Sequence, residues 1–376
     1  VCFGSSMQAG SFVKYDKMGE SSGSTGAAAG KLFIDSYVVT EKVHGANFCV
    51  IASKPSPNSA VIVRFAKRTA IIGGIEDAED FYGCRSAGLL RHLAPSAEGA
   101  FQILEASDSQ ESPLQAVHVY GELFGGCYPH QDVPAIPGMQ PVQVGVWYAP
   151  DLHFMAFDVV VETQGSRRYL PFDMAADVCR ESGFMFAETL FRGTLAECSD
   201  FEIEFETTIP CRLRLPPLPL GASGERNLAE GCVVRPVGEP PSHLEGVRAG
   251  KESTRGLFKR KIAQFSEKRY QNEDWKKGKA GAEVHYSMPV EELVSIEVVA
   301  SVTEQRLDNV LSKIGRVDIR DQQGCRRVLE DFKQDVRESL EDADLEVLRG
   351  SADLEETLDK LSRSLIKQRL LGKNRT

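Results

Sequence analysis

The segment Val38-Val-Thr-Glu-Lys42-Val-His-Gly45-Ala-Asn-Phe48 decides how this chain is interpreted. It joins two short β-rich runs, Tyr37–Thr40 and Phe48–Ala52, so its lysine lies in the connection between two predicted strands. We expect Gly45 to allow a tight turn, because glycine lacks a Cβ atom. A Lys-x-x-Gly spacing alone is common by chance, so its meaning depends on the motifs that accompany it.

Short β-rich runs dominate the chain from about residue 32 to residue 235. Two helices are expected among them, over Ala175–Glu181 and Leu195–Glu202. Pro210 and the Pro216–Pro219 cluster predict a long surface loop. The remaining runs that predict strands are Ala60–Arg64, Val117–Glu122, His153–Val161 and Gly231–Arg235.

The sequence changes character after about residue 285. Val290–Leu311 and Gln322–Leu371 lack proline and show helical periodicity, and Gly350 followed by Ser351 predicts a helix end and a new N-cap. We therefore expect an α+β chain, with a β-rich domain at 1–284 and an all-α domain at 285–376. The apolar stripes of the helical domain are Leu329, Phe332, Val336 and Leu340, then Leu354, Leu358, Leu361 and Leu365.

Composition excludes several classes of protein. The chain has 376 residues, 42% hydrophobic and 26% charged, which rules out wholesale disorder. No apolar run approaches the roughly 18 residues of a membrane-spanning helix, so we expect no membrane partner. Nine cysteines without a Cys-x-x-Cys spacing favour buried thiols in a reducing, intracellular setting. The first residue is Val rather than Met, which is compatible with a fragment of a longer chain.

The charge is unevenly distributed. The formal net charge is −10, yet the segment 251–279 carries ten basic and four acidic residues. An acidic protein with one basic segment is typical of binding to a localised anion, such as phosphates or nucleic acid. A solvated basic loop is the alternative that charge alone leaves open.

Further motifs follow the lysine segment in a fixed order and carry a family resemblance. Thr40–Phe48 resembles motif I of the RNA ligase 2 family, which includes a bacteriophage RNA ligase and the trypanosome RNA-editing ligases. The opening Phe12–Tyr15 resembles the start of the family, and Val302–Gly315 resembles the phage-type helical domain. The intervening motifs are the basic Ala66–Thr69, the acidic-aromatic Glu79–Gly83, motif III at Tyr120–Leu123, motif IIIa at Phe154–Asp158, motif IV at Ala229–Pro236 and motif V at Phe258–Lys261.

The resemblance implies a fold and a reaction. The fold would be a nucleotidyltransferase domain, with two antiparallel sheets cradling ATP and helices flanking them, followed by the helical domain. Lys42 would take AMP from ATP, pass it to the 5′-phosphate of RNA, and the enzyme would seal that end to a 3′-hydroxyl. The implied substrates and cofactors are ATP, Mg²⁺ and nicked or bridged duplex RNA. RNA repair or RNA editing, within a processing complex or in a mitochondrion, is a role that the trypanosome members suggest.

Two lysines of motif V bear on the nucleophile. An ordinary lysine is protonated at neutral pH and is a poor nucleophile, whereas nearby cations favour the neutral amine. Lys259 and Lys261 alternate on a predicted strand and point to one face, where they would also neutralise the α-phosphate. An exposed strand edge with protective charges is the alternative reading of these residues.

The resemblance assigns the remaining site residues one by one. His44 and Asp158 would be catalytic, with His44 acting on the pyrophosphate or the sealing step and Asp158 serving either metal or structure. Glu230 would help to hold the metal, and Phe157 would stack on adenine; a buried ion pair and a core aromatic are the alternatives. Nucleotide-binding positions would be Glu41, Val43, Asn47, Arg68, Glu122, Phe157, Glu230, Lys259 and Lys261, and RNA-binding positions would be Arg68, Arg306 and Asp335.

Two rival functions remain open at this point. A DNA ligase or capping enzyme uses the same lysine chemistry, but such enzymes usually append a β-barrel module where this tail is helical. A non-catalytic RNA-binding subunit with a ligase fold is the second, and the intact lysines and glutamates argue against it. The sequence also departs from the family in motif IV, where Arg235 stands before the proline instead of lysine.

Overall fold

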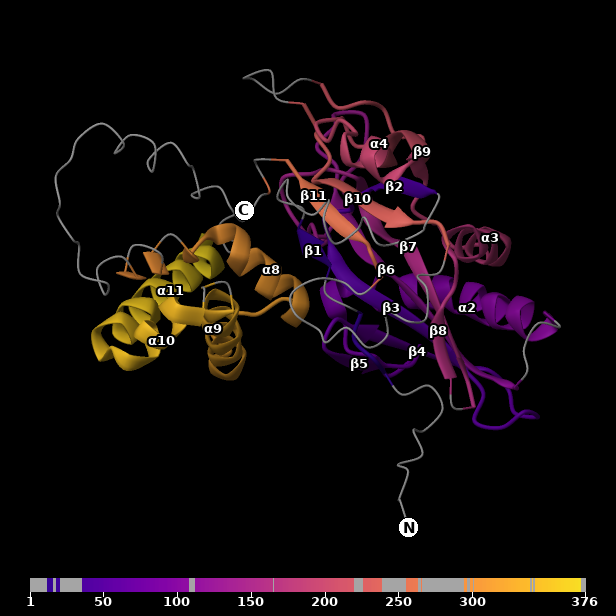
Figure 1. Cartoon of the computed structure of the whole chain (residues 1–376), viewed down its shortest axis with the longest axis horizontal. Helices are drawn as coiled ribbons and strands as arrows, with labels where there is room; N and C mark the ends of the chain where they lie inside the picture. The colour runs from indigo at the N-terminus through magenta and orange to yellow at the C-terminus, as the bar shows by residue number, and fades with distance from the viewer. Residues whose placement is uncertain are drawn as a thin grey trace, which may run out of the picture. The chain divides into compact units, whose positions relative to one another are not determined.

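A computed structural model describes the chain in two compact units, residues 1–262 and 263–376 (Figure 1). The expected domain boundary between residues 284 and 285 lies outside the described residues. So do most of the low-complexity segment 19–30 and most of the basic segment 251–279. The described residues are 12–15, 18–20, 36–107, 112–164, 166–219, 226–238, 255–262, 265, 294–295, 298–299, 301–338, 340 and 342–372.

The first unit contains two sheets. Five strands form the smaller sheet, in which neighbours are antiparallel except for the parallel pair β1 and β11. Its strands, in spatial order, are β1 (Gly19–Glu20), β11 (Phe258–Lys261), β10 (Gly231–Pro236), β2 (Tyr37–Glu41) and β9 (Thr189–Gly193). Because motifs I, IV and V supply β2, β10 and β11, three motifs that are far apart in sequence lie side by side.

The larger sheet has six antiparallel strands. Its central strands β3, β6 and β7 are longer than the runs that predicted them, because residues on both sides of those runs also continue the ladder. In spatial order the strands are β5 (Ala70–Gly73), β4 (Ile62–Lys67), β3 (Ala46–Ser53), β6 (Leu114–Cys127), β7 (Ala149–Thr163) and β8 (Ser166–Tyr169).

Two helices cover one face of the larger sheet, α2 (Leu89–Ala106) and α3 (Phe172–Ser182) (Figure 1). Helix α2 was not expected from the sequence, since it contains Pro95, and proline usually interrupts a helix. Its apolar residues recur every three or four positions and enter the main core, which outweighs that local penalty. The fully buried aromatic side chains of this core include Phe48, Phe65, Phe81, Phe101 and Phe186.

The described residues of the first unit also include three shorter helical segments. The 3₁₀-helix η1 spans Phe81–Gly83. Helix α4 (Leu195–Ser199) begins at a capping box but ends three residues before the predicted Glu202. Helix α5 (Ile209–Arg212) occupies part of the predicted loop, because Pro210 fits the first turn of a helix, where its missing N–H is not needed.

The second unit is helical. Its long described helices are α8 (Glu304–Ile314), α9 (Gln322–Arg337), α10 (Asp342–Gly350) and α11 (Ala352–Gly372). All of the predicted stripe residues except Leu361 lie in or pack against one apolar cluster, in which Phe332 and Leu358 are fully buried. One helix ends at Gly350, and Ser351 precedes the next, as predicted. The expectation of an α+β chain with antiparallel sheets and a helical C-terminal part is confirmed. In the described part of the chain, no helix has both the length and the apolar character needed to cross a membrane.

Candidate active site

The candidate site begins at the connection between the two sheets. Strand β2 belongs to the smaller sheet and β3 to the larger one, so residues 42–45 cross from one sheet to the other. The amide of Lys42 donates to the carbonyl of Gly231, 3.0 Å away, which anchors the crossing to β10. Gly45 is required by close approach, because a Cβ atom there would lie 2.2 Å from the carbonyl oxygen of Leu123 on β6.

One carboxylate gathers the central charges. Lys42 Nζ lies 2.6 Å from Glu230 Oε2, and Lys261 Nζ lies 3.1 Å from Glu230 Oε1. His44 Nδ1 is 3.3 Å from Glu230 Oε2. The Glu230 side chain is only 2% exposed, so these ion pairs are weakly screened by water. Motifs I, IV and V therefore meet at a single buried carboxylate.

A second carboxylate, Glu122, lies in the same electrostatic environment with a different protonation behaviour. Burial raises the pKa of Glu122 to about 7, and the negative charge of Glu230 adds to this while Lys42 opposes it. Burial also acts against ionisation of Glu230, yet the charges of Lys42 and Lys261 hold its pKa well below the ordinary value. The site thus holds one firmly ionised carboxylate and one that titrates near neutral pH.

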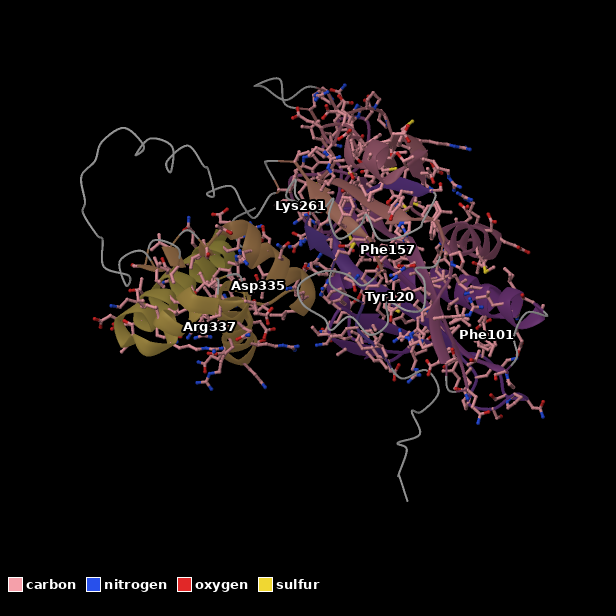
Figure 2. The ribbon with its side chains drawn as sticks, viewed as in Figure 1. Phe101, Tyr120, Phe157, Lys261, Asp335 and Arg337 are labelled. Carbon is pink, nitrogen blue, oxygen red and sulfur yellow. The ribbon has the colours of Figure 1, made fainter. Side chains whose placement is uncertain are left out.

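The two motif V lysines lie on one face of β11, as the alternation predicted. Lys259 is opposite Val233 of β10, and Lys261 is opposite Gly231. Lys261 is the last residue of β11 (Figure 2). Of these two lysines, Lys261 forms a described ion pair with Glu230. Lys259 lies two residues earlier on the strand and is half-buried.

Three of the expected nucleotide-binding residues, Asn47, Glu122 and Phe157, lie on the face of the larger sheet opposite α2 and α3. Asn47 is directly opposite Glu122 in the β3–β6 ladder, and the charge of Arg68 acts on Glu122. Phe157 is half-buried in an apolar cluster with Tyr120, and its ring meets that of Tyr15 at 5.1 Å between centroids (Figure 2). This face therefore carries a polar pair, Asn47 and Glu122, and an aromatic cluster that includes Phe157.

Asp158 lies apart from the lysine cluster in a network of its own. Its carboxylate is fully buried and contacts Arg235 at 3.0 Å and Arg255 at 2.8 Å, and it accepts a hydrogen bond from Tyr15 Oη at 2.8 Å. Burial opposes its ionisation, but the two arginines hold its pKa below the ordinary value. Arg235 also donates to the carbonyl of Phe157. One guanidinium thus serves two acceptors, which the single ammonium group of a lysine would do with less fixed geometry.

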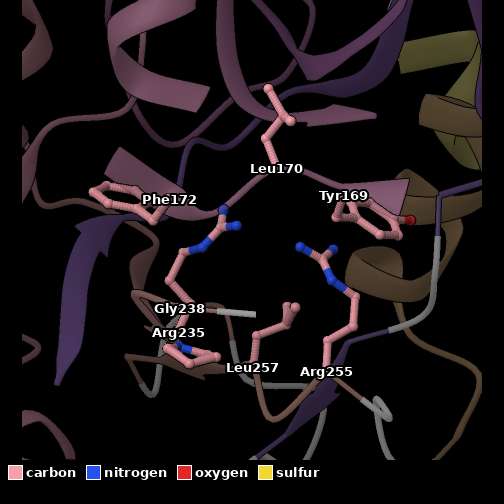
Figure 3. A pocket seen from close by; sticks show the side chains of 8 residues that line it. Tyr169, Leu170, Phe172, Arg235, Gly238, Arg255 and Leu257 are labelled. Atoms are coloured by element: carbon pink, nitrogen blue, oxygen red, sulfur yellow. The ribbon is translucent and has the colours of Figure 1, made fainter. Parts of the chain in front are cut away.

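Arg235 and Arg255 also line a small pocket beside β8 and β10, where their guanidinium groups face one another (Figure 3). Arg255 lies 3.4 Å from the ring centroid of Tyr169, a close cation–π contact. The structure does not bring Asp158 to Lys42, and its described contacts favour the structural half of the prediction made for it.

The two other motif I candidates are used within the protein. The Glu41 carboxylate accepts from the backbone amide of Thr208 at 2.8 Å, from the Thr208 hydroxyl at 2.7 Å and from the Thr207 hydroxyl. Burial raises the pKa of Glu41, and these hydrogen bonds partly offset the effect. Val43 is buried. Only the backbone of these two residues is therefore suited to contact a nucleotide.

The two candidate RNA-binding residues of the helical unit contact each other. Arg306 Nη1 lies 3.1 Å from Asp335 Oδ2, and Lys313 Nζ lies 3.1 Å from Asp335 Oδ1. Arg306 is only 8% exposed, so the pair joins α8 to α9. Contact of either residue with RNA stays a prediction.

Sequence motifs did not reveal every residue that supports the site. Tyr148 Oη accepts a hydrogen bond from the backbone amide of His44, 2.8 Å away. The Asn227 side chain makes two hydrogen bonds to the backbone of Trp147. Both residues come from irregular segments without periodicity, so only their chemical type, a tyrosine and an amide in otherwise loop-like stretches, hinted at a role.

Among the residues that the structure describes, no group of three or more His, Cys, Asp or Glu side chains is arranged to hold a metal ion. Glu230 and Glu122 are the carboxylates beside Lys42. A hard cation such as Mg²⁺ is commonly held by one or two carboxylates together with phosphate oxygens and water. This donor set fits a metal that arrives with a triphosphate.

Comparison with family models gives two matches that together cover most of the chain. Residues 35–261 match the RNA ligase family, which is more than half of the sequence. Residues 287–372 match the C-terminal domain described as T4 RNA ligase 2 C-terminal.

Curated relatives come from a trypanosome. Over 220 residues the chain is 34% identical to the mitochondrial RNA-editing ligase 2 of Trypanosoma brucei brucei, covering 54% of this chain and 49% of that protein. Over 321 residues it is 30% identical to the mitochondrial RNA-editing ligase 1, covering 74% and 64%. The chain thus spans between half and two thirds of the length of these relatives.

Solved structures with some similarity include an RNA ligase from Naegleria gruberi determined with ATP and manganese. It shares 11% identity, with a TM-score of 0.38 and coverage of 68% of this chain and 58% of that one. An archaeal ATP-dependent RNA ligase shares 15% identity, with a TM-score of 0.36 and coverage of 94% and 65%.

Proposed function

Because the chain belongs to the RNA ligase family, we propose that it is an ATP-dependent RNA ligase that works through a lysyl-AMP intermediate on Lys42. The observation that carries the proposal is the buried Glu230 carboxylate, which brings Lys42, Lys261 and His44 together where the chain crosses between the sheets. Both cations at this carboxylate are ammonium groups, which can change partners and lose a proton, and an imidazole lies beside them.

The first step forms a bond between Lys42 Nζ and the α-phosphorus of ATP and breaks the bond from that phosphorus to pyrophosphate. Lys42 Nζ has to leave Glu230 and lose a proton before it can attack. An arriving phosphate competes for the ammonium groups of Lys42 and Lys261, which favours that release. Lys261 and Lys259 then neutralise the charge that grows on the phosphate oxygens.

The later steps use RNA. The 5′-phosphate of one RNA end attacks the lysine-bound AMP and displaces Lys42, which gives a 5′–5′ linked adenylylated end. The 3′-hydroxyl of a second end then attacks that 5′-phosphate, forms the phosphodiester bond and releases AMP. His44, whose Nδ1 lies 3.3 Å from Glu230 Oε2, would act on the departing pyrophosphate or on the sealing step.

Nucleotide recognition is assigned to the face of the larger sheet opposite α2 and α3. Phe157 would stack on adenine, a contact typically worth about 1–3 kcal/mol for a base on an aromatic ring. Glu122 and Asn47, opposite each other in the ladder, would bind ribose, and Arg68 would bind phosphate of the nucleotide or of the RNA end.

Mg²⁺ is the metal that we propose, held by Glu230 and phosphate oxygens. When bound, it supplies charge neutralisation and orientation of the phosphates. The two carboxylates support this proposal, because the negative charge of Glu230 raises the pKa of Glu122. A bound cation would reduce that repulsion and favour the ionised form of both.

Labelling with α-³²P nucleotides tests the proposal. The protein should become labelled from ATP and not from GTP, in the presence of Mg²⁺, and the label should withstand denaturing electrophoresis. Lys42→Ala should abolish labelling yet retain some sealing of RNA that already carries a 5′-adenylyl group. Lys54→Ala removes a lysine that pairs with Glu105 on the surface and serves as the control. Labelling of Lys42→Ala protein would exclude Lys42 as the nucleophile.

The same labelling, together with a sealing assay on nicked RNA and nicked DNA, separates the rival functions. A capping enzyme would take label from GTP, a DNA ligase would seal nicked DNA in preference to nicked RNA, and a non-catalytic subunit would take no label. The names of the trypanosome relatives support mitochondrial RNA editing as the setting in which this chain works.

A further inference from the structure

We propose that Tyr148 is a positioning residue for the nucleophile, holding the turn that carries Lys42 through the backbone of His44. The inference rests on the proposed function, since it concerns the same lysine. Tyr148 lies immediately before β7, in a stretch where the sequence predicted no site residue. Its described contacts are with the backbone amide of His44 and the ring of Phe124, so its action on Lys42 would be indirect.

The crossing between the sheets lacks the ladder hydrogen bonds that fix a strand. Lys42 is bonded to Gly231 on the smaller sheet, and regular pairing with β6 resumes only at Ala46. Between these two points, the backbone amide of His44 donates a hydrogen bond to a side chain. The acceptor is Tyr148 Oη, 2.8 Å away. A buried amide without an acceptor costs free energy, so this bond selects one conformation of the turn.

Tyr148 is itself held rigidly. Its side chain is only 2% exposed, and its ring packs edge-on against Phe124 of β6, with 5.2 Å between centroids. The preceding residue, Trp147, accepts from Asn227 Nδ2 at 2.7 Å and donates to Asn227 Oδ1 at 2.9 Å. Asn227 lies three residues before Glu230, so the support for Tyr148 also leads to the carboxylate that pairs with Lys42.

The connections close into a ring around the nucleophile. The Asn227 carbonyl accepts from the amide of Thr207 at 3.0 Å, and Thr207 and Thr208 bind the carboxylate of Glu41. Glu41 precedes Lys42, and His44 follows it by two residues. Both sides of the lysine are thereby tied to the same support, one through a side chain and the other through Tyr148.

The hydroxyl of Tyr148 stays protonated in this setting. Burial raises the pKa of Tyr148 well above its ordinary value, and the nearby carboxylates of Glu41, Glu230 and Glu122 act in the same direction. The ring position and the hydrogen bond together indicate a neutral, fixed acceptor for the His44 amide. Such a support matters because displacement of a reacting group by about 1 Å can cost roughly a hundredfold in rate.

Tyr148→Phe tests the inference by removing one oxygen and leaving the ring in place. Tyr128→Phe is the matched control, because Tyr128 is also buried and its hydroxyl donates to the backbone carbonyl of Pro216 at 2.6 Å. Single-turnover self-adenylylation of the full chain should be measured over a range of ATP concentrations, together with thermal melting. The maximal rate of Tyr148→Phe should fall about tenfold with the ATP half-saturation unchanged within twofold.

Asn227→Ala provides a second variant, since it frees the backbone beside Tyr148 without touching the ring. It should show the same loss of maximal rate, while Tyr128→Phe stays within twofold of the wild type. A rate for Tyr148→Phe equal to that of Tyr128→Phe, or a loss explained wholly by a lower folded fraction or by weaker ATP binding, would overturn the inference. An unlabelled wild-type protein would instead overturn the proposed function itself.

Discussion

Two buried carboxylates of the first unit, Glu230 and Asp158, each hold two cations, and the choice of cation distinguishes them. Glu230 holds the ammonium groups of Lys42 and Lys261, and Asp158 holds the guanidinium groups of Arg235 and Arg255. Both carboxylates are at most 2% exposed.

The difference between lysine and arginine partners indicates which of the two clusters can change its contacts during a reaction. A guanidinium is planar, offers several fixed donors and keeps its charge, so a pair with carboxylate is oriented and lasting. An ammonium is a point charge on a flexible chain that can exchange one oxygen for another and can lose its proton. The arginine cluster is therefore suited to structural support and the lysine cluster to chemistry.

The largest effect is expected at the arginine cluster. Asp158→Asn leaves Arg235 and Arg255 facing each other without a balancing charge, and breaking a buried pair in this way costs about 3–5 kcal/mol. Urea denaturation should show this loss of unfolding free energy, with adenylylation per folded molecule much less affected. Glu230→Gln is the matched change at the lysine cluster. If Glu230→Gln destabilised the protein more than Asp158→Asn, the contrast between the clusters would be lost.

The next effect concerns the lysine cluster and appears in rate. Lys259→Ala and Lys261→Ala should each slow self-adenylylation by about a hundredfold or more, because each removes charge at the α-phosphate. Arg260→Ala is the control on the same strand, since Arg260 points to the opposite face and donates to the carbonyl of Phe201. Equal self-adenylylation rates in all three variants would instead support the alternative that β11 is an ordinary charged strand edge.

A smaller effect is expected in the dependence of stability on pH. The folded protein binds the proton of Glu122 up to about pH 7, whereas an unfolded chain releases it near the ordinary value of 4.5. This stabilisation is present at low pH and is lost as the pH rises through about 7, an amount on the order of 2 kcal/mol. The unfolding free energy of Glu122→Gln should fall less between pH 5 and 8 than that of the wild type. Exposed Glu98→Gln should keep the wild-type slope.

The smallest effect is expected in the second unit, where Asp335 pairs with one guanidinium group and one ammonium group and so allows the two kinds of cation to be compared at a single carboxylate. Arg306→Ala removes the buried guanidinium and Lys313→Ala the more exposed ammonium. We expect a loss of about 1–2 kcal/mol for Arg306→Ala and less than about 1 kcal/mol for Lys313→Ala. Thermal melting checks the order, and adenylylation should not change. Weaker RNA binding by Arg306→Ala at unchanged stability would instead support the predicted RNA contact.

Much of the candidate site was predictable because strand registers place its residues. Lys42, Glu230 and Lys261 stand at the ends of adjacent strands, so ordered motifs were enough to bring them together. The role of Asp158 was harder to predict, since its partner Arg255 lies in a basic segment whose charge suggested surface binding. Tyr148 was missed because its contact comes from a segment without periodicity.

The fold, too, was predictable in some parts and not in others. Alternation and helical periodicity predicted most central strands and the C-terminal helices, since those patterns report directly which side chains are buried. Helix α2 was missed because Pro95 signals a break locally, while the burial of Leu90, Ala97 and Phe101 favours the helix only after the larger sheet exists. Local signals fail where tertiary contacts decide.

Gly45 has a consequence for the tolerance of this gene to variation. Every amino-acid replacement there adds a Cβ atom, and the atom it meets is a main-chain oxygen of Leu123, which cannot rotate away as a side chain can. A saturation mutagenesis survey should therefore find residue 45 intolerant of alanine as well as of larger residues. Such a position would be recorded as essential because of its packing, and a map of essential positions would extend beyond the residues that perform the chemistry.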